Sequence, residues 1–407
     1  MKRLFFINRY FWPDHSATSQ ILSQLAFALA EAGWKVHVVT SQQLYDDPGA
    51  RLATQETIRG VVIHRIAGTK FGRTGLLGRA IDYLTFYLAS WRLLLSTADK
   101  GDILVPMTDP PLLSVLGRRV AKRRRAQLVN WLQDIYPEVA AALNVPLIKW
   151  PISSLMTWLR NASLRTADAN VIVGERMAEK LRTLGVASDR IHVIPNWCDD
   201  EQIVPVAAAE NPLRKKCQLE DKFVVGYSGN LGRAHEFETL LAAAEQLKNH
   251  PRIVFLFIGS GHRKDELARQ VNARGLSETF RFLPYHDIDV LKYSLSIPDI
   301  HWISLRPELE GLIVPSKLYG IAAAGRPIIA ITARDGEIAQ LVRQHNCGLV
   351  IEPGHADELA AVLARLSSDP SSLSTMGARA RLMLDTHFTR RQAFDRWRNL
   401  LDKVGQS

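Results

Sequence analysis

The sequence has no long hydrophobic run. No stretch reaches the about 18 consecutive apolar residues that a membrane-spanning helix needs. The nearest approach, residues 80–96, is interrupted by Asp82 and Arg92, so we expect a helix that buries one or two faces. The first apolar run, Leu4 to Ile7, is too short for a secretion signal. We expect it to form the first strand of the fold.

Cysteine is scarce, and two common nucleotide-binding signatures are missing. Cys198, Cys217 and Cys347 are scattered and odd in number, which predicts reduced thiols in a cytoplasmic protein rather than disulfides or a zinc site. The chain contains neither the P-loop lysine motif nor the three-glycine dinucleotide loop with its distant acid. These absences argue against a P-loop ATPase and against an NAD enzyme. No nucleic-acid-binding module is recognisable either.

What the sequence does contain is apolar content for large cores and an excess of positive charge. The chain has 407 residues, 47% of them hydrophobic, and a formal net charge of +10. This length predicts two or three domains, and the charge favours an anionic partner such as a nucleotide or an anionic lipid surface. Short apolar strands alternate with helical stretches throughout, a pattern typical of α/β folds with parallel sheets.

The alternation falls into two series separated by a polar stretch. We expect two doubly wound α/β domains with a cleft between them, at residues 1–196 and 223–387. Residues 197–222 lack a clear period and are predicted to be a linker. The amphipathic C-terminal segment, residues 388–407, is predicted to pack back on the first domain.

The most informative segment runs from Glu310 to Pro327. It predicts a short turn followed by a helix that begins near Ser316, with Lys317 in the first turn. Free N–H groups at a helix start, a hydroxyl and a mobile cation together favour an anion. An ordinary capped helix start accounts for the same spacing.

Two further turns follow strands of the second domain. The first contains Gly229, Gly232, Arg233 and His235, and the second contains the pair Gly259 and Gly261. Glycine lets a backbone approach a ligand closely, and arginine can bind phosphate oxygens in a bidentate manner. The carboxyl ends of parallel strands are where open α/β sheets bind ligands. We therefore predict a diphosphate site at this edge.

In the first domain, the loops after two strands carry chemically useful side chains. The loop after the first strand contains His15, between Asp14 and Ser16, and the loop after residues 128–132 contains Asp134. Each can orient a hydroxyl or exchange a proton, and each can equally be a simple helix cap. The basic run at residues 118–125, beside an aromatic helix, favours weak contact with anionic lipid headgroups.

In this order, the motifs resemble those of family 4 retaining glycosyltransferases with the GT-B fold, particularly bacterial enzymes of surface-polysaccharide assembly such as fucosamine and colanic-acid transferases. The resemblance spans nearly the whole chain. It is carried by residues 10–18, 133–138, 193–199, 227–235 and 310–327.

The resemblance implies a nucleotide-sugar donor bound by the second domain and a lipid-linked or saccharide acceptor bound by the first. It implies an enzyme without cofactor or metal, because cationic side chains face the diphosphate and the nucleotide sugar is a co-substrate. The implied catalytic residues are Arg233, Lys317, Asp134 and His15. The implied substrate-binding residues are Gln133, Gly229, Asn230, Gly232, His235, Gly259, Gly261, Glu310, Gly311, Leu312, Ser316 and Tyr319.

The sequence departs from the family pattern at several of these positions. The family pairs two glutamates eight positions apart, but here the second position is Gly320 and Glu310 lies two residues early. Asn230 and His235 stand where the family has arginine and lysine, and Gln133 stands where it often has histidine. We therefore expect an altered donor contact.

Two alternatives stay open at this point. A nucleotide-sugar 2-epimerase on the same fold would consume donor without an acceptor, and a non-catalytic module would bind saccharide or lipid alone. For a transferase we expect a cytoplasmic location, with weak peripheral contact at the inner face of the membrane.

Overall fold

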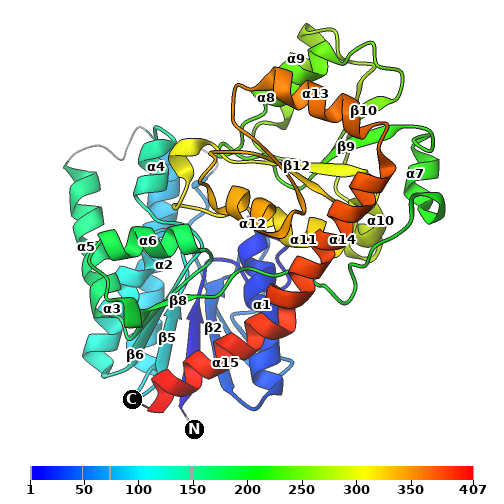
Figure 1. The fold of residues 1–407 in the computed structure, drawn as a ribbon. Coiled ribbons are helices and arrows are strands. Elements are labelled where there is room, and N and C mark those ends of the chain that lie inside the picture. Colours follow the sequence, from blue (N-terminus) through cyan, green and yellow to red (C-terminus); the bar gives the residue numbers. More distant parts are fainter. Residues whose placement is uncertain (1, 48, 73–74, 146–150, 407) are drawn as a thin grey trace. The chain divides into compact units, whose positions relative to one another are not determined.

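The computed structural model describes residues 2–47, 49–72, 75–145 and 151–406. The chain divides into two compact units, each an α/β sandwich around a largely parallel sheet (Figure 1). Unit 1 comprises residues 1–195 and 393–407, and unit 2 comprises residues 196–392. Among the described residues, no helix has the length and apolar character required to cross a bilayer.

Unit 1 contains an eight-stranded sheet in the order β3-β4-β2-β1-β5-β6-β7-β8, parallel except for the β3–β4 pair. Its strands are β1 (Arg3–Ile7), β2 (Lys35–Ser41), β3 (Gln55–Ile58), β4 (Val61–Ile66), β5 (Ile103–Pro106), β6 (Gln127–Leu132), β7 (Ala169–Ile172) and β8 (Ile191–Val193). Its helices are α1 (Ala17–Glu31), α2 (Leu76–Thr97), α3 (Leu113–Arg124), α4 (Glu138–Ala142), α5 (Ile152–Thr166), α6 (Glu175–Thr183) and, from residue 393 on, α15 (Arg390–Gln406).

The two faces of this sheet are buried by different helices. Successive strand side chains point to opposite faces, so Phe5 packs with buried residues of α2 and α3, whereas Phe6 faces α15. There the Trp397 ring lies 4.6 Å from the ring of Trp131 and 6.5 Å from that of Phe6. The C-terminal helix therefore packs on the sheet of unit 1, and both chain ends lie in this unit (Figure 1).

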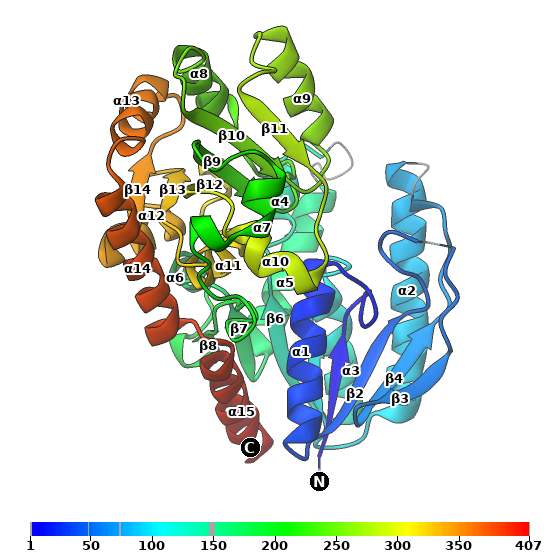
Figure 2. The same ribbon diagram turned by 90° about the vertical axis from the view of Figure 1, so that its right-hand side faces the viewer.

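Unit 2 contains a six-stranded parallel sheet in the order β11-β10-β9-β12-β13-β14 (Figure 2). Its strands are β9 (Phe223–Ser228), β10 (Ile253–Ile258), β11 (Phe280–Leu283), β12 (Ile300–Ser304), β13 (Ile328–Ile331) and β14 (Gly348–Ile351). Its helices are α7 (Pro212–Lys216), α8 (Glu238–Gln246), α9 (Lys264–Ala273), α10 (Leu291–Leu295), α11 (Lys317–Ala323), α12 (Glu337–His345), α13 (Ala356–Leu366) and α14 (Pro370–His387). Short 3-10 turns lie at residues 188–190 in unit 1 and at 208–210, 288–290 and 307–309 in unit 2.

The strand order of unit 2 reverses between β9 and β12. The chain moves outward from β9 through β10 to β11, and then returns to pair β12 with the other side of β9. Loops diverge at such a reversal and leave a crevice at the carboxyl ends of the two strands, which is where doubly wound sheets bind ligands. Here these ends are Ser228 and Ser304.

The segment that we predicted to be a linker is a packed part of unit 2. Residues 197–222 contain α7, whose Arg214 is buried. The guanidinium group forms a bidentate ion pair with Asp299 at 2.9 and 3.0 Å. It also donates to the carbonyl groups of Leu219, Lys222 and Ile297. The low periodicity of this segment reflects its short helix and many turns, not an absence of structure.

Arg214→Ala is expected to destabilise unit 2 by about 3 kcal/mol, because it leaves the partly buried Asp299 carboxylate without its counter-ion and removes the hydrogen bonds of a buried guanidinium group. The urea midpoint of the lowest unfolding transition of the full chain measures this effect. Lys215→Ala, one residue away on the exposed side of α7, is the control and should change stability by less than about 0.5 kcal/mol. Equal midpoints for the two variants would contradict the structural role of the ion pair.

Candidate functional site

Two turns of unit 2 pack backbone against backbone at the crevice. Gly229 follows β9 with φ of +124°, and Gly259 and Gly261 follow β10 with φ of +136° and +134°. A Cβ atom on Gly259 would collide with the Gly229 carbonyl oxygen, and one on Gly261 would collide with the Leu231 backbone. Glycine is therefore required at these positions by packing between the turns and by their positive φ.

Gly229 has a second neighbour. A Cβ atom at Gly229 would lie 2.9 Å from Cε of Lys317. The aliphatic part of the Lys317 side chain therefore passes directly over Gly229. Through this contact the start of α11 meets the turn after β9. The structure brings the predicted glycine turns and Lys317 together at the carboxyl edge of the sheet.

The Lys317 ammonium group has no described carboxylate within ion-pair distance. Its Nζ lies 3.2 Å from Nε2 of His235 and 5.1 Å from the ring centroid of Tyr227. Burial lowers the pKa of Lys317 to about 8. A largely buried cation without a counter-ion favours an anionic ligand, since pairing offsets its desolvation.

His235 differs from what we predicted for it. We expected its side chain to reach phosphate oxygens beside Arg233, in place of the family's cationic lysine. It is instead 8% exposed, its Nδ1 lies 2.8 Å from the carbonyl oxygen of Ser304, and burial lowers its pKa to about 3, with the nearby Lys317 charge acting in the same direction. The imidazole is neutral and is directed at Lys317.

The other residues of the turn after β9 are more open. Arg233 is exposed, and its Nη2 lies 3.2 Å from Nε2 of His262 in the turn after β10. Asn230 is also exposed, and its backbone oxygen accepts a hydrogen bond from the Tyr227 hydroxyl at 2.7 Å. Gly232 has open space at its Cβ position. These residues remain accessible at the rim of the crevice.

Glu310 is engaged within the protein. Its carboxylate accepts hydrogen bonds from the Thr332 hydroxyl and, at 3.2 Å, from the backbone N–H of Glu337 in the first turn of α12. The Cβ-free backbone of Gly336 leaves the room that this carboxylate occupies. Burial raises the pKa of Glu310. The predicted substrate ligand thus ties the loop before α11 to the start of α12.

The remaining predicted residues of this segment lie close to α11. Ser316 precedes α11, and its side chain forms no capping hydrogen bond to that helix. Gly311 has a φ of +71°, and Leu312 is buried. Tyr319 is 1% exposed and its ring packs against Phe388. The Tyr319 ring therefore belongs to the core, and the role predicted for Tyr319 in substrate binding stays a prediction.

In unit 1, Asp134 lies immediately beyond β6. Its Oδ1 atom is buried and has no hydrogen-bond partner among the described residues. Burial, with a smaller contribution from the neighbouring charge of Asp109, raises the pKa of Asp134 to about 7. A carboxyl group with such a pKa exchanges a proton readily near neutral pH.

The sequence analysis missed the surroundings of Asp134. Asp109 follows the adjacent strand β5, and burial raises its pKa to about 6. The guanidinium group of Arg9 lies 5.3 Å from the ring centroid of Tyr83. Burial raises the pKa values of Tyr83 and Tyr136, and the charge of Asp134 is a smaller cause in the same direction. We call Arg9, Tyr83, Asp109, Asp134 and Tyr136 the acidic-aromatic cluster. The Asp-Pro and Tyr-Pro pairs at strand ends were the available sequence signal.

His15 and Gln133 occupy different environments. The His15 side chain is exposed, and its backbone oxygen accepts a hydrogen bond from Gln20 at 2.7 Å. The preceding Asp14 is buried and accepts bonds from the N–H groups of Ser16 and Tyr45, so it holds the loop. Gln133 is partly buried next to Asp134. The roles of His15 and Gln133 in binding stay predictions.

Comparison with known proteins agrees with this architecture. Residues 17–197 match the family described as "Glycosyl transferase 4-like domain", and residues 210–383 match "Glycosyl transferases group 1". Two solved structures illustrate the fold: HepE of Anabaena in complex with UDP (TM-score 0.73, 14% identity, 98% of this chain and 100% of that one), and sucrose-phosphate synthase of Thermosynechococcus elongatus (TM-score 0.77, 20% identity, 99% of both chains).

Curated relatives are similar over part of the chain. A putative colanic acid biosynthesis glycosyl transferase, WcaI of Escherichia coli, is 28% identical over 62% of this chain and 63% of its own length. The probable glycosyltransferase WbjE of Pseudomonas aeruginosa is 25% identical over 73% of both chains. The aligned part of this chain thus spans slightly less than two thirds of the Escherichia coli relative.

The two α/β units and these likenesses define a protein with the GT-B fold, which confirms the predicted fold class. The chain belongs to the glycosyltransferase family that combines a glycosyl transferase 4-like domain with a group 1 domain. The family resemblance predicted from the sequence motifs is confirmed.

Proposed function

We propose that this protein transfers a sugar from a nucleoside diphosphate donor to a hydroxyl group of a lipid-linked or saccharide acceptor. The observation that carries the proposal is the partly buried ammonium group of Lys317, which lacks a described counter-ion at the carboxyl edge of the unit 2 sheet. The colanic acid biosynthesis name of the Escherichia coli relative, and the lipopolysaccharide core biosynthesis name of a Rhizobium meliloti relative, support our proposal of a role in bacterial exopolysaccharide, O-antigen or capsule synthesis. The HepE structures with UDP and UDP-glucose support a nucleotide-sugar donor.

The chemistry requires stabilisation of a leaving group. The bond between the anomeric carbon and the β-phosphate oxygen breaks, and negative charge grows on that oxygen. In our proposal Lys317 faces this charge, with Arg233 at the rim as a second cation. The acceptor oxygen bonds to the anomeric carbon from the same side, so the configuration is retained, and its proton passes to the departing phosphate. No metal or cofactor is needed in this scheme.

We assign the acceptor to unit 1. The unpartnered Oδ1 of Asp134 can accept a hydrogen bond from a sugar hydroxyl, and the tyrosine rings of the acidic-aromatic cluster offer apolar faces to a sugar ring. Asp134 then orients the acceptor hydroxyl for attack on the anomeric carbon.

Lys317→Ala is expected to weaken nucleoside diphosphate binding about 10- to 100-fold, the usual effect of losing a hydrogen bond from a charged donor. Calorimetric titration with UDP, GDP and dTDP in parallel measures the dissociation constants. Lys248→Ala, which removes an exposed lysine after α8, is the matched control and should leave them unchanged. A folded Lys317→Ala variant that binds all three nucleotides as the wild type does would overturn the proposed donor site. Consumption of a nucleotide sugar without any acceptor would instead favour an epimerase.

We also propose that unit 1 contacts an anionic membrane surface through α2 and α5. Helix α2 has a buried stripe and, opposite it, exposed leucine and isoleucine side chains at intervals of three and four residues: Leu77, Ile81, Leu84 and Leu88. A solvated helix face normally carries polar residues at such positions. On α5, Ile152, Leu155 and Trp158 are likewise exposed, Trp158 at 66%.

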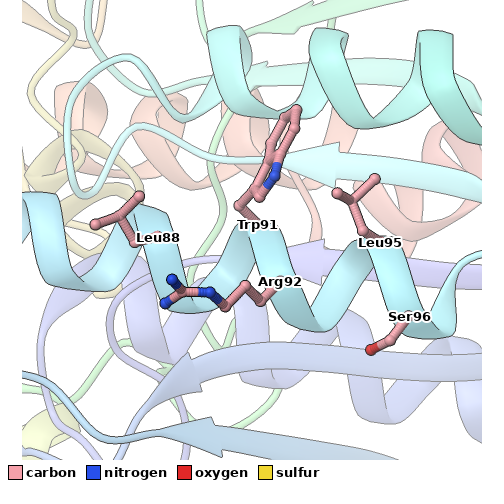
Figure 3. A pocket seen from close by; sticks show the side chains of 5 residues that line it. All are labelled: Leu88, Trp91, Arg92, Leu95 and Ser96. Atoms are coloured by element: carbon pink, nitrogen blue, oxygen red, sulfur yellow. The ribbon is translucent and has the colours of Figure 1, made fainter.

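The exposed stripe of α2 continues into an open hollow lined by Leu88, Trp91, Arg92, Leu95 and Ser96 (Figure 3). Arg123, at the end of α3, lies 4.8 Å from the ring centroid of Trp91. Arg119, Lys122 and Arg125, from the same basic run of α3 and its end, are exposed as well. Apolar side chains bordered by basic ones suit the headgroup region of an anionic bilayer, at about 1 kcal/mol for each basic residue.

A double variant, Leu84→Asp with Leu88→Asp, is expected to lower binding to phosphatidylglycerol-containing vesicles by at least about tenfold, since burying one leucine contributes about 1.5–3 kcal/mol. Vesicle co-sedimentation measures the binding, with pure phosphatidylcholine vesicles as reference. The control is Leu382→Asp, which changes an exposed leucine of α14. Unchanged vesicle binding, or conversion of a dimer to a monomer by the double variant, would contradict the membrane contact.

A further inference from the structure

The protonation state of the His235 ring follows from its contacts. The carbonyl oxygen of Ser304, 2.8 Å from Nδ1, can only accept a hydrogen bond, so Nδ1 carries the proton. Nε2 of the neutral ring then has a lone pair and no proton. The ammonium group of Lys317, 3.2 Å away, has only protons to donate. The Lys317 Nζ therefore donates to Nε2 of His235.

The second partner of the Lys317 ammonium group, the Tyr227 ring, is also a neutral group that attracts a cation. Nζ lies 5.1 Å from the ring centroid of Tyr227, whose face attracts a cation. The Tyr227 ring in turn lies 5.8 Å from the His235 ring at an interplanar angle of 79°. Both partners of Lys317 are neutral, so they fix its position without cancelling its charge. A carboxylate in either place would hold the lysine and neutralise it.

The other charged and titratable groups near His235 and Lys317 do not neutralise the Lys317 charge. From the start of α9, Arg263 donates to the His235 backbone oxygen at 2.8 Å, and its own charge is paired with Glu266. From β9 comes the Tyr227 hydroxyl, bonded to the backbone oxygen of Asn230. From β12 come the neutral carbonyl and hydroxyl groups of Ser304, the hydroxyl accepting from the backbone N–H of Glu236. Glu236, next in the chain, is engaged by Thr239.

We propose that His235 is a positioning residue: its Nε2 lone pair holds the Lys317 ammonium group in the crevice with its full charge available to the diphosphate of the donor. This inference rests on the proposed function and refines it. The imidazole does not contact phosphate as a cation in this account, and it acts only through Lys317.

Two substitutions distinguish the hydrogen bond that Nδ1 donates to Ser304 from the hydrogen bond that Nε2 accepts from Lys317. Asn at position 235 has its amide near the place of Nδ1 and can still donate to Ser304, but it does not reach Lys317. Gln at position 235 has an amide oxygen near the place of Nε2 and can still accept from Lys317. His235→Asn is therefore expected to weaken UDP, GDP or dTDP binding about tenfold, the effect of losing one hydrogen bond to a charged group, whereas His235→Gln stays within about threefold of the wild type.

The pH profile provides a readout that loss of packing alone would not change. With the pKa of free Lys317 near 8, the lysine is charged below that pH, so nucleotide affinity is full there and falls as the pH rises through 8. Loss of the Nε2 acceptor destabilises the ammonium form, so in His235→Asn the fall should begin at lower pH. An unshifted profile in a folded His235→Asn variant overturns the proposal.

A double-mutant cycle with Lys317→Ala completes the test. If His235 acts through Lys317, His235→Asn has no further effect on nucleotide affinity once Lys317 is removed. The same tenfold loss in both backgrounds would mean that His235 acts on the ligand or the fold directly, and would overturn the proposal. If Lys317→Ala alone leaves affinity unchanged, the donor site itself fails. Should His235→Asn not fold, His235→Ala, which also removes the Nε2 acceptor, replaces it in the pH profile and in the cycle with Lys317→Ala.

Discussion

A partly buried ammonium group held by neutral partners is the interaction on which this account depends. Lys317 lies against the lone pair of His235 and the ring face of Tyr227, with no described carboxylate within ion-pair distance. Burying a cation costs free energy unless an anion compensates it. The protein therefore keeps an unfavourable charge in its unliganded form, and in our proposal a diphosphate relieves that cost on binding. Such pre-placed charge stabilises a leaving group without reorganisation during the reaction.

The fold supplies this arrangement through contacts among backbones. Reversal of strand order between β9 and β12 opens the sheet edge, and the glycine turns after β9 and β10 close against each other where no Cβ atom fits. Glu310 fixes the loop before α11 by bonding to Thr332 and to the start of α12. Lys317 is thus positioned from two sides, by the segment after β9 and by the loop that leads into α11.

The sequence predicted what depends on local pattern. Buried strands, strand-following glycines and the start of α11 at Lys317 all leave short-range signals. They predicted that these residues meet at the carboxyl edge of the unit 2 sheet, where the structure brings Gly229, Gly259 and Lys317 together. Features set by distant partners were not predictable. The tautomer of His235 is set by Ser304, 69 residues away. The Glu310 carboxylate is engaged by Thr332 and Glu337, which lie 22 and 27 residues away in the sequence. Likewise Arg214 gains its structural role from Asp299, 85 residues along the chain, so the segment looked like a linker. The tyrosines around Asp134 converge from separate elements, which no spacing rule reveals.

The most direct measurement of the central claim is a crystal structure of the protein with the nucleoside diphosphate, among UDP, GDP and dTDP, that most raises its melting temperature. The account predicts a β-phosphate oxygen within hydrogen-bond distance of Lys317 Nζ, about 2.7–3.2 Å, with Nζ still bonded to His235. A diphosphate bound elsewhere on unit 2, with the Lys317 ammonium group untouched, would contradict it.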